Sequence, residues 1–368
     1  MIITCNRAEL QAAVLNISRA VAPKSPIPAL EGILLKTSPE GVFLCGYDLS
    51  LGITTFLPAT VAEDGEIIFG AKLFGDIVRS LPDGNITISV NEKYNAEITG
   101  GESAFHIVGI AASEYPDLPS VSGGTDIRLP QTTLKSMIRQ TLFAVSTSDA
   151  KPIHTGSRFV VEKGSIRLVA VDGCRLAMRT EPANTTETAE FVVPGKTLGE
   201  VMKLMDDDEG EVEIGVGRRH IIFNVGNYSV ISRLLEGEFL DYKKAVPAGV
   251  RTEITVPTRR FIEAVERMSL VVNDRLKSPI RCLFDDGCVR FSCETAIGTA
   301  KDRFAIGPVK EPIEIGFNNR YLLDAFRAAE TDEVRVQLNG PLSPIKILPS
   351  EGDHFLFLVL PVRLRSGE

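Results

Sequence analysis

The 368-residue sequence lacks the signatures of several common protein classes. Its longest uninterrupted apolar stretch, 355–362, has 8 residues, whereas a helix that crosses a bilayer needs about 20. Residues 1–7 show no charged segment followed by an apolar run, the pattern of a secretory signal. The six cysteines include no CxxC pair and do not suit a disulfide scaffold in a chain of this length. We therefore expect a soluble, reduced, cytoplasmic protein with no membrane contact.

An excess of positive charge is also missing. The sequence has 40 Lys and Arg against 48 Asp and Glu, which gives a net charge of −8. A role on DNA would therefore require basic residues gathered on one face of the protein. Hydrophobic residues make up 44% and charged residues 24% of the sequence. This is ordinary globular composition, and it excludes disorder of the whole chain.

The common catalytic and metal-binding motifs do not occur. The four histidines are scattered and form no HExxH motif, and there is no GxSxG motif. The acidic run 206–209 follows a predicted helix and indicates a solvated turn, because a carboxylate run alone defines no coordination geometry. The sequence gives no positive evidence for an active site, and we expect neither a metal nor a cofactor.

One partial motif supports an alternative function. Gly195-Lys196-Thr197 lies between a predicted strand and a predicted helix, like the end of a phosphate-binding loop. The full motif needs a glycine five residues before Gly195, and that position is Glu190. A nucleotide-dependent enzyme built around Lys196 is therefore the second hypothesis, and a purely protein-binding scaffold is the third.

The sequence does contain a threefold internal repeat. A strand, a short polar joint and a helix recur at 68–79, 192–203 and 315–327. Corresponding charged residues in the three segments are 124 residues apart: Lys72, Lys196 and Arg320; Asp76, Glu200 and Asp324; Arg79, Lys203 and Arg327. The repeat predicts three domains of one kind, over residues 1–125, 126–250 and 251–368.

Each copy has the same predicted order of elements. It begins with an amphipathic helix, for which Asn6 and Thr132 are candidate N-caps in the first two copies. A strand, the second helix and a hairpin follow, with strands at 32–35, 165–170 and 289–292 and hairpins beginning at 86–89, 212–215 and 334–337. We expect an α+β fold with two helices per copy packed on antiparallel sheets, and connectors at 119–126 and 245–252.

The repeated cations predict a basic surface. In each second helix two cations are separated by seven residues, just under two turns, so they lie on one face about 10 Å apart. Solvated cations are common on helices, but a same-face pair in all three copies of an acidic chain is not expected by chance. Such a surface would contact phosphates without reading bases. The first helices add four cations to the expected DNA-facing set: Lys135, Arg139, Arg260 and Arg267.

Three related domains joined end to end predict an arc. If each domain turns the chain by about 60°, two chains that meet head to tail close a ring, because a heterologous interface closes when its rotation permits. A closed ring would hold DNA by topology. The contacts with phosphates could then stay weak and mobile, as sliding requires.

The sequence resembles the bacterial replicative sliding clamps, the beta subunits of DNA polymerase III. The resemblance covers essentially the whole chain and is carried by residues 172–177, 235–242, 316–324 and 360–364. It implies a non-catalytic, ring-shaped, head-to-tail dimer of six domains. Such a ring encircles duplex DNA without sequence specificity, confers processivity on the replicative polymerase and tethers other DNA-processing proteins. A separate ATP-driven loader would place it on closed DNA.

The resemblance also implies a pocket between the second and third domains. The polymerase catalytic subunit, the clamp loader and repair proteins would dock short linear peptides there. An apolar cleft with an arginine at its rim suits a peptide with one or two hydrophobic anchors. The expected pocket residues are His154, Val171, Gly173, Arg175, Leu176, Leu240, Lys244, Ala245, Leu342, Pro344, Leu358, Leu360, Pro361 and Val362.

The same resemblance implies a dimer seam and further DNA contacts. The seam would place Phe105 and Ile107 against Val271 and Val272 in the third domain of a second copy, since an edge strand with apolar residues suits intermolecular pairing. The loop residues Lys24 and Lys151 are expected to contact DNA. Cys174, Leu240, Leu360 and the extension 365–368 depart from the usual family pattern, which affects the expected peptide preference more than the expected location of the pocket.

Overall fold

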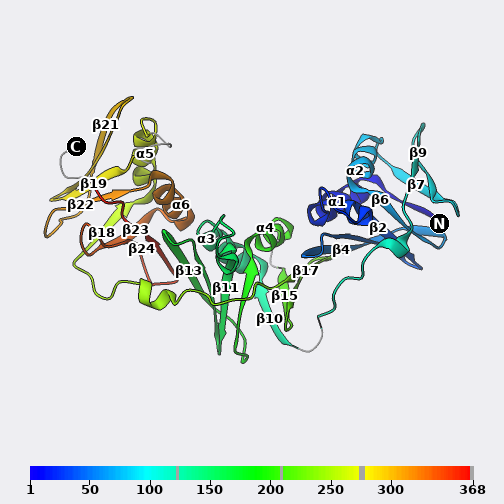
Figure 1. The fold of residues 1–368 in the computed structure, drawn as a ribbon, viewed down its shortest axis with the longest axis horizontal. Coiled ribbons are helices and arrows are strands. Elements are labelled where there is room, and N and C mark those ends of the chain that lie inside the picture. The colour runs from blue at the N-terminus through cyan, green and yellow to red at the C-terminus, as the bar shows by residue number, and fades with distance from the viewer. Residues whose placement is uncertain (122–123, 208–209, 273–277, 365–368) are drawn as a thin grey trace. The chain divides into compact units, whose positions relative to one another are not determined.

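The computed structural model describes residues 1–121, 124–207, 210–272 and 278–364. Each copy of the repeat contributes two α-helices to this described part (Figure 1). The first helices are α1 (Arg7–Ile17), α3 (Gln131–Leu142) and α5 (Thr258–Ser269), and the second are α2 (Ala71–Ser80), α4 (Gly195–Leu204) and α6 (Asn319–Ala329). The predicted helices are therefore confirmed, as is the α+β class. None of the described helices is long and apolar enough to span a bilayer.

Two smaller antiparallel sheets belong to the first and third copies. In hydrogen-bonded order, one consists of β5 (Thr60–Glu63), β1 (Ile2–Asn6), β7 (Asn85–Val90), β8 (Asn95–Gly100) and β9 (Ser103–Val108). The other consists of β21 (Gly298–Ala305), β20 (Cys288–Thr295), β19 (Ile280–Asp285) and β22 (Ile313–Phe317). Strands β9 and β21 are therefore sheet edges.

Two eight-stranded antiparallel sheets each combine strands of two copies. The first consists of β10 (Thr125–Pro130), β15 (Glu211–Val216), β16 (His220–Val225), β17 (Tyr228–Arg233), β4 (Leu51–Pro58), β3 (Gly41–Tyr47), β2 (Gly32–Ser38) and β6 (Glu66–Gly70). The second consists of β18 (Thr252–Pro257), β23 (Glu333–Leu338), β24 (Ile345–Pro349), β25 (Phe355–Val359), β13 (Arg175–Pro182), β12 (Ser165–Val171), β11 (Gly156–Glu162) and β14 (Ala189–Pro194). Strand by strand, the two sheets have the same order.

The copies are joined at corresponding strand pairs in these sheets. Strand β17 of the second copy pairs with β4 of the first, and β25 of the third pairs with β13 of the second. The contacts accordingly divide the chain into two compact units, Met1–Leu134 with Lys196–Leu234, and Lys135–Gly195 with Leu235–Glu368. This division cuts the second copy, because its strands belong to two different sheets. The domain limits at 125 and 250 remain a prediction.

The helices pack on the sheets through the apolar residues that the sequence pattern indicates. Leu10, Leu134 and Phe261, which begin the pattern in the three first helices, are completely buried. In the third copy the rings of Phe261 on α5 and Phe326 on α6 stack with centroids 3.8 Å apart. Full burial of a phenylalanine side chain contributes about 1.5–3 kcal/mol to stability, so this contact holds the helix pair together.

The helix N-termini confirm one predicted cap and correct another. The side chain of Asn6 accepts hydrogen bonds from the backbone N–H groups of Ala8 (2.9 Å) and Glu9 (3.3 Å), as predicted. The prediction for Thr132 is wrong, because α3 already begins at Gln131. Strand β10 extends to Pro130, and the N–H of Gln131 donates to the carbonyl of Gly210 (2.8 Å). The helix therefore starts directly at the end of the strand.

The predicted connectors are shorter than expected. Residues 122 and 123 lie outside the described part, and β10 already begins at Thr125. The second connector lies between η5 (Tyr242–Ala245), a single 3₁₀ turn, and β18. The predicted hairpin strands at 86–89, 212–215 and 334–337 are confirmed in β7, β15 and β23.

The cap of α6 yields a stability prediction. The side chain of Asn318 accepts hydrogen bonds from the N–H groups of Arg320 (2.9 Å) and Tyr321 (3.2 Å). Asn318→Ala removes this acceptor and is expected to lower the free energy of unfolding by about 1 kcal/mol, as measured by urea denaturation. Asn318→Asp keeps an acceptor at the same position and serves as the control. An unchanged denaturation midpoint in Asn318→Ala would show that the cap does not stabilise the helix.

Candidate nucleic-acid interface and partner pocket

The cations of the second helices occupy identical helical positions. Lys72, Lys196 and Arg320 are each the second residue of their helix, and the partner cations seven residues later are each the ninth. All six side chains are exposed. Because positions two and nine are just under two turns apart, each pair lies on one face of its helix. This face carries Lys72 and Arg79, Lys196 and Lys203, and Arg320 and Arg327.

The other expected cations are placed on loops and on the first helices. Lys24 and Lys151 are exposed in loops, Lys24 after the 3₁₀ turn η1 (Ser18–Ala20) and Lys151 just before η4 (Pro152–Thr155). Arg139, Arg260 and Arg267 are exposed on α3 and α5, and Lys135 is half-buried. The first compact unit contains Lys24, Lys72, Arg79, Lys196 and Lys203, and the second contains Lys135, Arg139, Lys151, Arg260, Arg267, Arg320 and Arg327.

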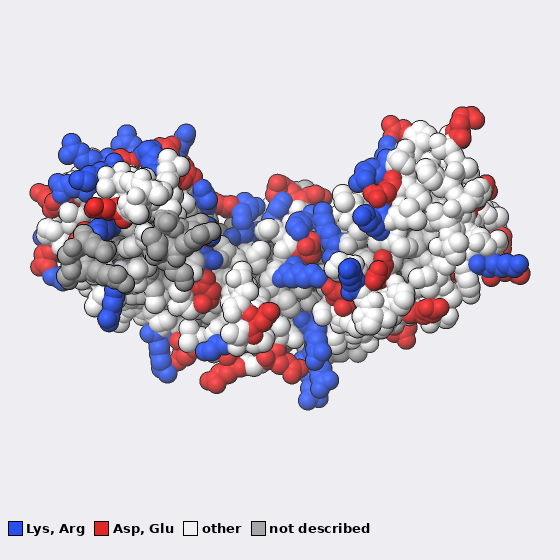
Figure 2. All heavy atoms as spheres, turned by 45° about the horizontal axis from the view of Figure 1, so that its top comes forward, with Lys and Arg blue, Asp and Glu red and all other residues white. Residues whose placement is uncertain are grey.

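Carboxylates lie beside many of these cations. Figure 2 shows Lys and Arg interspersed with Asp and Glu over the face in view. Ion pairs in which both side chains are exposed, such as those of Asp76 and Glu266, contribute about 0–1 kcal/mol each, so a phosphate can compete with the carboxylate. The pairs are Arg79–Asp76 (2.7 Å), Lys203–Glu200 (2.9 Å), Lys196–Asp48 (2.6 Å), Arg139–Glu330 (2.7 Å), Arg267–Asp302 (2.6 Å) and Arg327–Glu266 (2.6 Å).

Most of these carboxylates were not identified from the sequence. The repeat pointed to Asp76 and Glu200, which precede their cations by three residues. Asp48, Glu330 and Asp302 are distant from their partners in the sequence, and no local spacing indicates them. The candidate interface therefore has a weaker positive field than its Lys and Arg content alone suggests.

The segment around Lys196 does not form a phosphate-binding loop. Helix α4 begins at Gly195, and the Lys196 ammonium lies 2.6 Å from a carboxylate oxygen of Asp48. The Thr197 hydroxyl is buried and lies 2.7 Å from the hydroxyl of Ser232. It is therefore not exposed to a nucleotide or its metal ion. No cluster of His, Cys, Asp or Glu in the described residues could hold a metal.

The structure brings several expected pocket residues into one apolar cluster. Val171, Leu176 and Leu358 are buried together with Ile153, Phe239, Tyr242 and four further apolar residues. Three further expected pocket residues are large apolar side chains that remain exposed: 42% for Leu240, which follows Phe239, 66% for Leu342 and 43% for Leu360. Where exposed apolar side chains form one contiguous patch, they are typical of a docking surface.

Backbone contacts position the C-terminal residues of the expected pocket. The N–H of Leu360 donates to the carbonyl of Cys174 (2.8 Å), and the N–H of Val362 donates to the carbonyl of Gly316 (2.8 Å). Pro361, between them, and Pro344 are half-buried. Residues 365–368, the predicted extension, lie outside the described residues.

His154 and Leu240 also line a hollow of about 560 Å³. Its walls are residues 150–154 and 236–241. The His154 ring meets Phe239 edge to face with centroids 5.4 Å apart, and burial, followed by the charge of Lys151, lowers the pKa of His154. The imidazole is therefore neutral at pH 7. Lys244 and Ala245 are exposed at η5, where Lys244 pairs with Asp241 (3.0 Å).

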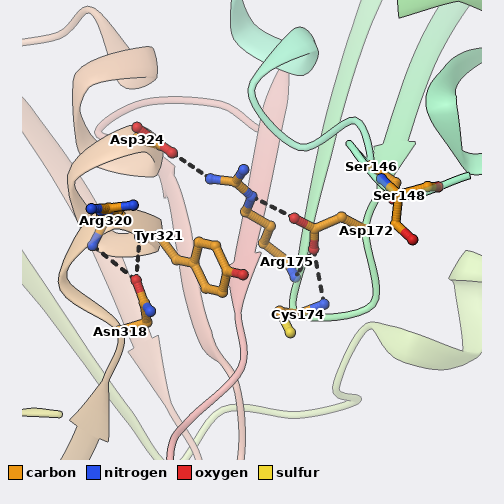
Figure 3. A network of polar contacts seen from close by, with 9 residues as sticks. All are labelled: Ser146, Ser148, Asp172, Cys174, Arg175, Asn318, Arg320, Tyr321 and Asp324. Carbon is orange, nitrogen blue, oxygen red and sulfur yellow. Dashed lines mark hydrogen bonds and ion pairs between the residues drawn. The ribbon is translucent and has the colours of Figure 1, made fainter. Parts of the chain in front are cut away.

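Arg175 lies in a polar network rather than at an open rim (Figure 3). Its side chain is only 11% exposed. The Nε donates to Asp172 (2.8 Å), and an Nη donates to Asp324 on α6. The guanidinium also lies 4.6 Å from the ring centroid of Tyr321, within cation–π range. The contact with Asp324 was not predicted from the sequence.

A tight turn connects this network with the cluster. Asp172 accepts hydrogen bonds from the N–H groups of Cys174 (2.9 Å) and Arg175 (3.0 Å) through one carboxylate oxygen. Gly173, between them, has φ +90°, a left-handed conformation that favours glycine. The exposed turn therefore links Val171 on β12 with Leu176 on β13.

The expected seam residues lie on the edge strand β9 and directly after helix α5. Phe105 and Ile107 are half-buried on β9, and the neighbouring Val108 is 73% exposed. Val271 and Val272 are half-buried after α5 and pack against the core of the third copy. The carbonyl of Val271 accepts a hydrogen bond from the Thr295 hydroxyl (2.8 Å) at the end of β20. The first pair therefore lies on an edge strand, and Val271 lies beside the end of β20, the neighbour of the edge strand β21.

Three family models match the chain in succession. The N-terminal domain of the DNA polymerase III beta subunit matches residues 1–119, the central domain residues 128–241 and the C-terminal domain residues 243–363. A protein named beta sliding clamp from Staphylococcus aureus is 32% identical over 356 residues, which is 94% of each chain.

Solved structures are similar over nearly the whole chain. The DNA polymerase sliding clamp of Bacillus subtilis has a TM-score of 0.96 and 31% identity, with 99% of this chain and 100% of that chain covered. A sliding clamp of Pseudomonas aeruginosa, solved bound to griselimycin, has a TM-score of 0.94 and 28% identity over the same shares. The chain therefore belongs to the DNA polymerase III beta subunit family, the bacterial sliding clamps.

Proposed function

We propose that the protein is a non-catalytic processivity factor that encircles duplex DNA and tethers the replicative polymerase. Two chains of the protein meet head to tail in a six-domain ring in the cytoplasm. The polymerase catalytic subunit, the clamp loader and repair proteins bind it through short peptides. The observation that carries the proposal is the same-face pair of exposed cations at positions two and nine of all three second helices, in a chain that belongs to the sliding clamp family.

The cation set makes non-specific and mobile contacts with DNA phosphates. At least six of the twelve proposed DNA-facing cations have a carboxylate within 3 Å, which limits the net gain from each phosphate contact. Topological enclosure supplies the retention that these weak contacts do not. The enzyme alternative is disfavoured because the Thr197 hydroxyl is buried against Ser232 and the Lys196 ammonium is paired with Asp48.

A double substitution tests the DNA-facing assignment. Lys72→Ala with Arg79→Ala is expected to shorten retention on nicked circular DNA and to reduce the slope of log affinity against log salt by about 2, because two phosphate contacts are lost. Retention is measured by gel filtration at several salt concentrations. Lys93→Ala with Lys163→Ala removes the same charge from exposed hairpin turns and is the control. Equal effects of both double variants would refute the assignment.

The dimer seam forms between β9 of one chain and β21 of the second chain. Within the chain, neighbouring domains are joined by antiparallel strand pairs, β4 with β17 and β13 with β25. A third pairing of the same kind between chains would cover both exposed edges, which otherwise invite non-specific association. Phe105, Ile107, Val271 and Val272 supply apolar contacts beside this pairing.

Charge at the seam is expected to separate the dimer. Phe105→Arg with Ile107→Arg places two cations against an apolar surface, where burial of an unpaired charge is costly. Sedimentation velocity should give a monomer, and retention on nicked circular DNA should disappear. Thr60→Arg with Asn85→Arg adds the same two charges at exposed positions on β5 and β7 of the same sheet and serves as a control for charge alone. A double seam variant that stays dimeric would show that the seam lies elsewhere.

The partner pocket consists of the apolar cluster around Leu176, the hollow beside His154 and the exposed leucines. This surface suits a peptide whose apolar side chains cover Leu240, Leu342 and Leu360. The proposed residues are those expected from the sequence: His154, Val171, Gly173, Arg175, Leu176, Leu240, Lys244, Ala245, Leu342, Pro344, Leu358, Leu360, Pro361 and Val362. Griselimycin, which is bound to the Pseudomonas clamp, is a ready probe for this pocket.

Removal of two exposed leucines tests the pocket. Leu342→Ser with Leu360→Ser should weaken griselimycin binding at least about tenfold, because the ligand loses apolar area that it would bury. Isothermal titration calorimetry measures the affinity. Val250→Ser changes an apolar side chain that is also exposed but outside the pocket, and it should bind like the wild type. Unchanged affinity in the double variant would place the binding site elsewhere.

A further inference from the structure

The turn at residues 172–175 lies at the junction between the second and third copies of the repeat. It has a counterpart at residues 48–51, at the junction between the first and second copies. Asp48 and Asp172 are 124 residues apart, and each accepts two backbone N–H groups of its own turn. The following strand pairs also correspond, since Arg233 donates to the carbonyl of Ser50 (2.9 Å) as Leu360 donates to that of Cys174 (2.8 Å). The two turns therefore have the same pattern of backbone hydrogen bonds.

The two turns are connected to the next second helix in different ways. At the first junction, the free oxygen of Asp48 accepts directly from Lys196 on α4. At the second junction, the corresponding oxygen of Asp172 accepts from the Nε of Arg175, which in turn donates to Asp324 on α6. The position of Arg175 is Leu51 in the first copy, where no such relay can form.

The acid at the sixth position of the second helix also differs between the copies. Glu200 on α4, the counterpart of Asp324, pairs with Lys203 (2.9 Å) and lies 3.9 Å from Arg19. Within the described residues it has no hydrogen bond to the first turn. Asp324 is instead bound by Arg175, while the cation three residues later, Arg327, pairs with Glu266 on α5 (2.6 Å). Of the two turns, the one in the second copy alone is linked to this acid within the described residues.

We propose that Asp324 is a positioning residue for the partner pocket, although it lies outside the set of pocket residues. It fixes Arg175, Arg175 fixes Asp172, and Asp172 sets the turn that carries Val171, Gly173 and Leu176. Figure 3 shows the side chains of Asp324, Arg175 and Asp172 in line between α6 and the turn. The inference rests on the proposed function, because it assigns Asp324 a role in that pocket.

Loss of the acid should loosen the turn and not only the helix. The Arg175 side chain is held by two carboxylates and by the ring of Tyr321. Without Asp324 one of the two charged contacts disappears, and the guanidinium can turn away from Asp172. Gly173 allows the released turn many backbone conformations. A binding surface that is not held to within about 0.5 Å by its supporting residues loses affinity.

Matched variants test the proposal in the full-length protein. Asp324→Asn should weaken griselimycin binding about tenfold, the scale expected for a lost hydrogen bond to a charged group. Glu200→Gln makes the same chemical change at the equivalent position of the first junction and should stay within about twofold of the wild type. Affinity is measured by isothermal titration calorimetry, and the unfolding midpoint of each variant is recorded alongside.

Hydrogen exchange supplies a readout that does not depend on the ligand. In Asp324→Asn the amides of Cys174 and Arg175, which donate to Asp172, should exchange faster, because the turn opens more often. In Glu200→Gln the corresponding amides of Ser50 and Leu51 should keep the wild-type rate. Unchanged exchange at the second turn in Asp324→Asn would overturn the proposal.

The possible outcomes separate this inference from the proposed function. If the wild type binds griselimycin and Asp324→Asn binds it equally well, the positioning role is wrong while the pocket stands. If the wild type does not bind griselimycin, the proposed pocket fails, and the positioning role fails with it. If Asp324→Asn and Glu200→Gln weaken binding equally, the effect reflects general loss of stability and the proposal is also overturned.

Discussion

The organisation of the protein depends on antiparallel strand pairing that continues from one copy of the repeat into the next. Strands β4 and β17 join the first copy to the second, and β13 and β25 join the second to the third. Each pairing extends a four-stranded sheet to eight strands, and its backbone hydrogen bonds hold neighbouring copies together. The helices on these sheets then present their cations at equivalent positions, because every copy repeats the same strand, joint and helix.

The same repetition makes the differences between the copies informative. Two turns with one backbone design have different connections to the following helix: Asp48 pairs directly with Lys196, whereas Asp172 reaches Asp324 through Arg175. In the direct pair, Asp48 neutralises Lys196, which is one of the proposed DNA-facing cations. The relay instead uses an arginine of the proposed pocket and leaves the pocket dependent on a helix residue. A repeat that diverges in this way can confine partner binding to one of two similar junctions.

Much of the fold could be predicted from the sequence. The 124-residue spacing predicted the three second helices, and the apolar periodicity predicted the three first helices with Leu10, Leu134 and Phe261 as core residues. The Thr132 cap was wrong because α3 begins at Gln131, two residues before the helix start that this cap implies, where the N–H of Gln131 donates to the carbonyl of Gly210. The candidate site was harder to predict from the sequence. Basic residues could be recognised from their repetition, as Lys196, or from the resemblance, as Arg175. The carboxylates that pair with them, such as Asp48 and Asp324, come from distant parts of the chain, and local spacing contains no information on such contacts.

The central claim is that retention on DNA comes from enclosure more than from affinity. The most direct measurement compares wild-type protein on nicked circular DNA before and after the circle is cut once, with loading by a clamp loader and separation by gel filtration. The account predicts that the protein stays on the circle and is lost when the cut creates ends from which it can slide. Equal retention on circular and linear DNA would contradict it, because only direct binding is indifferent to DNA topology.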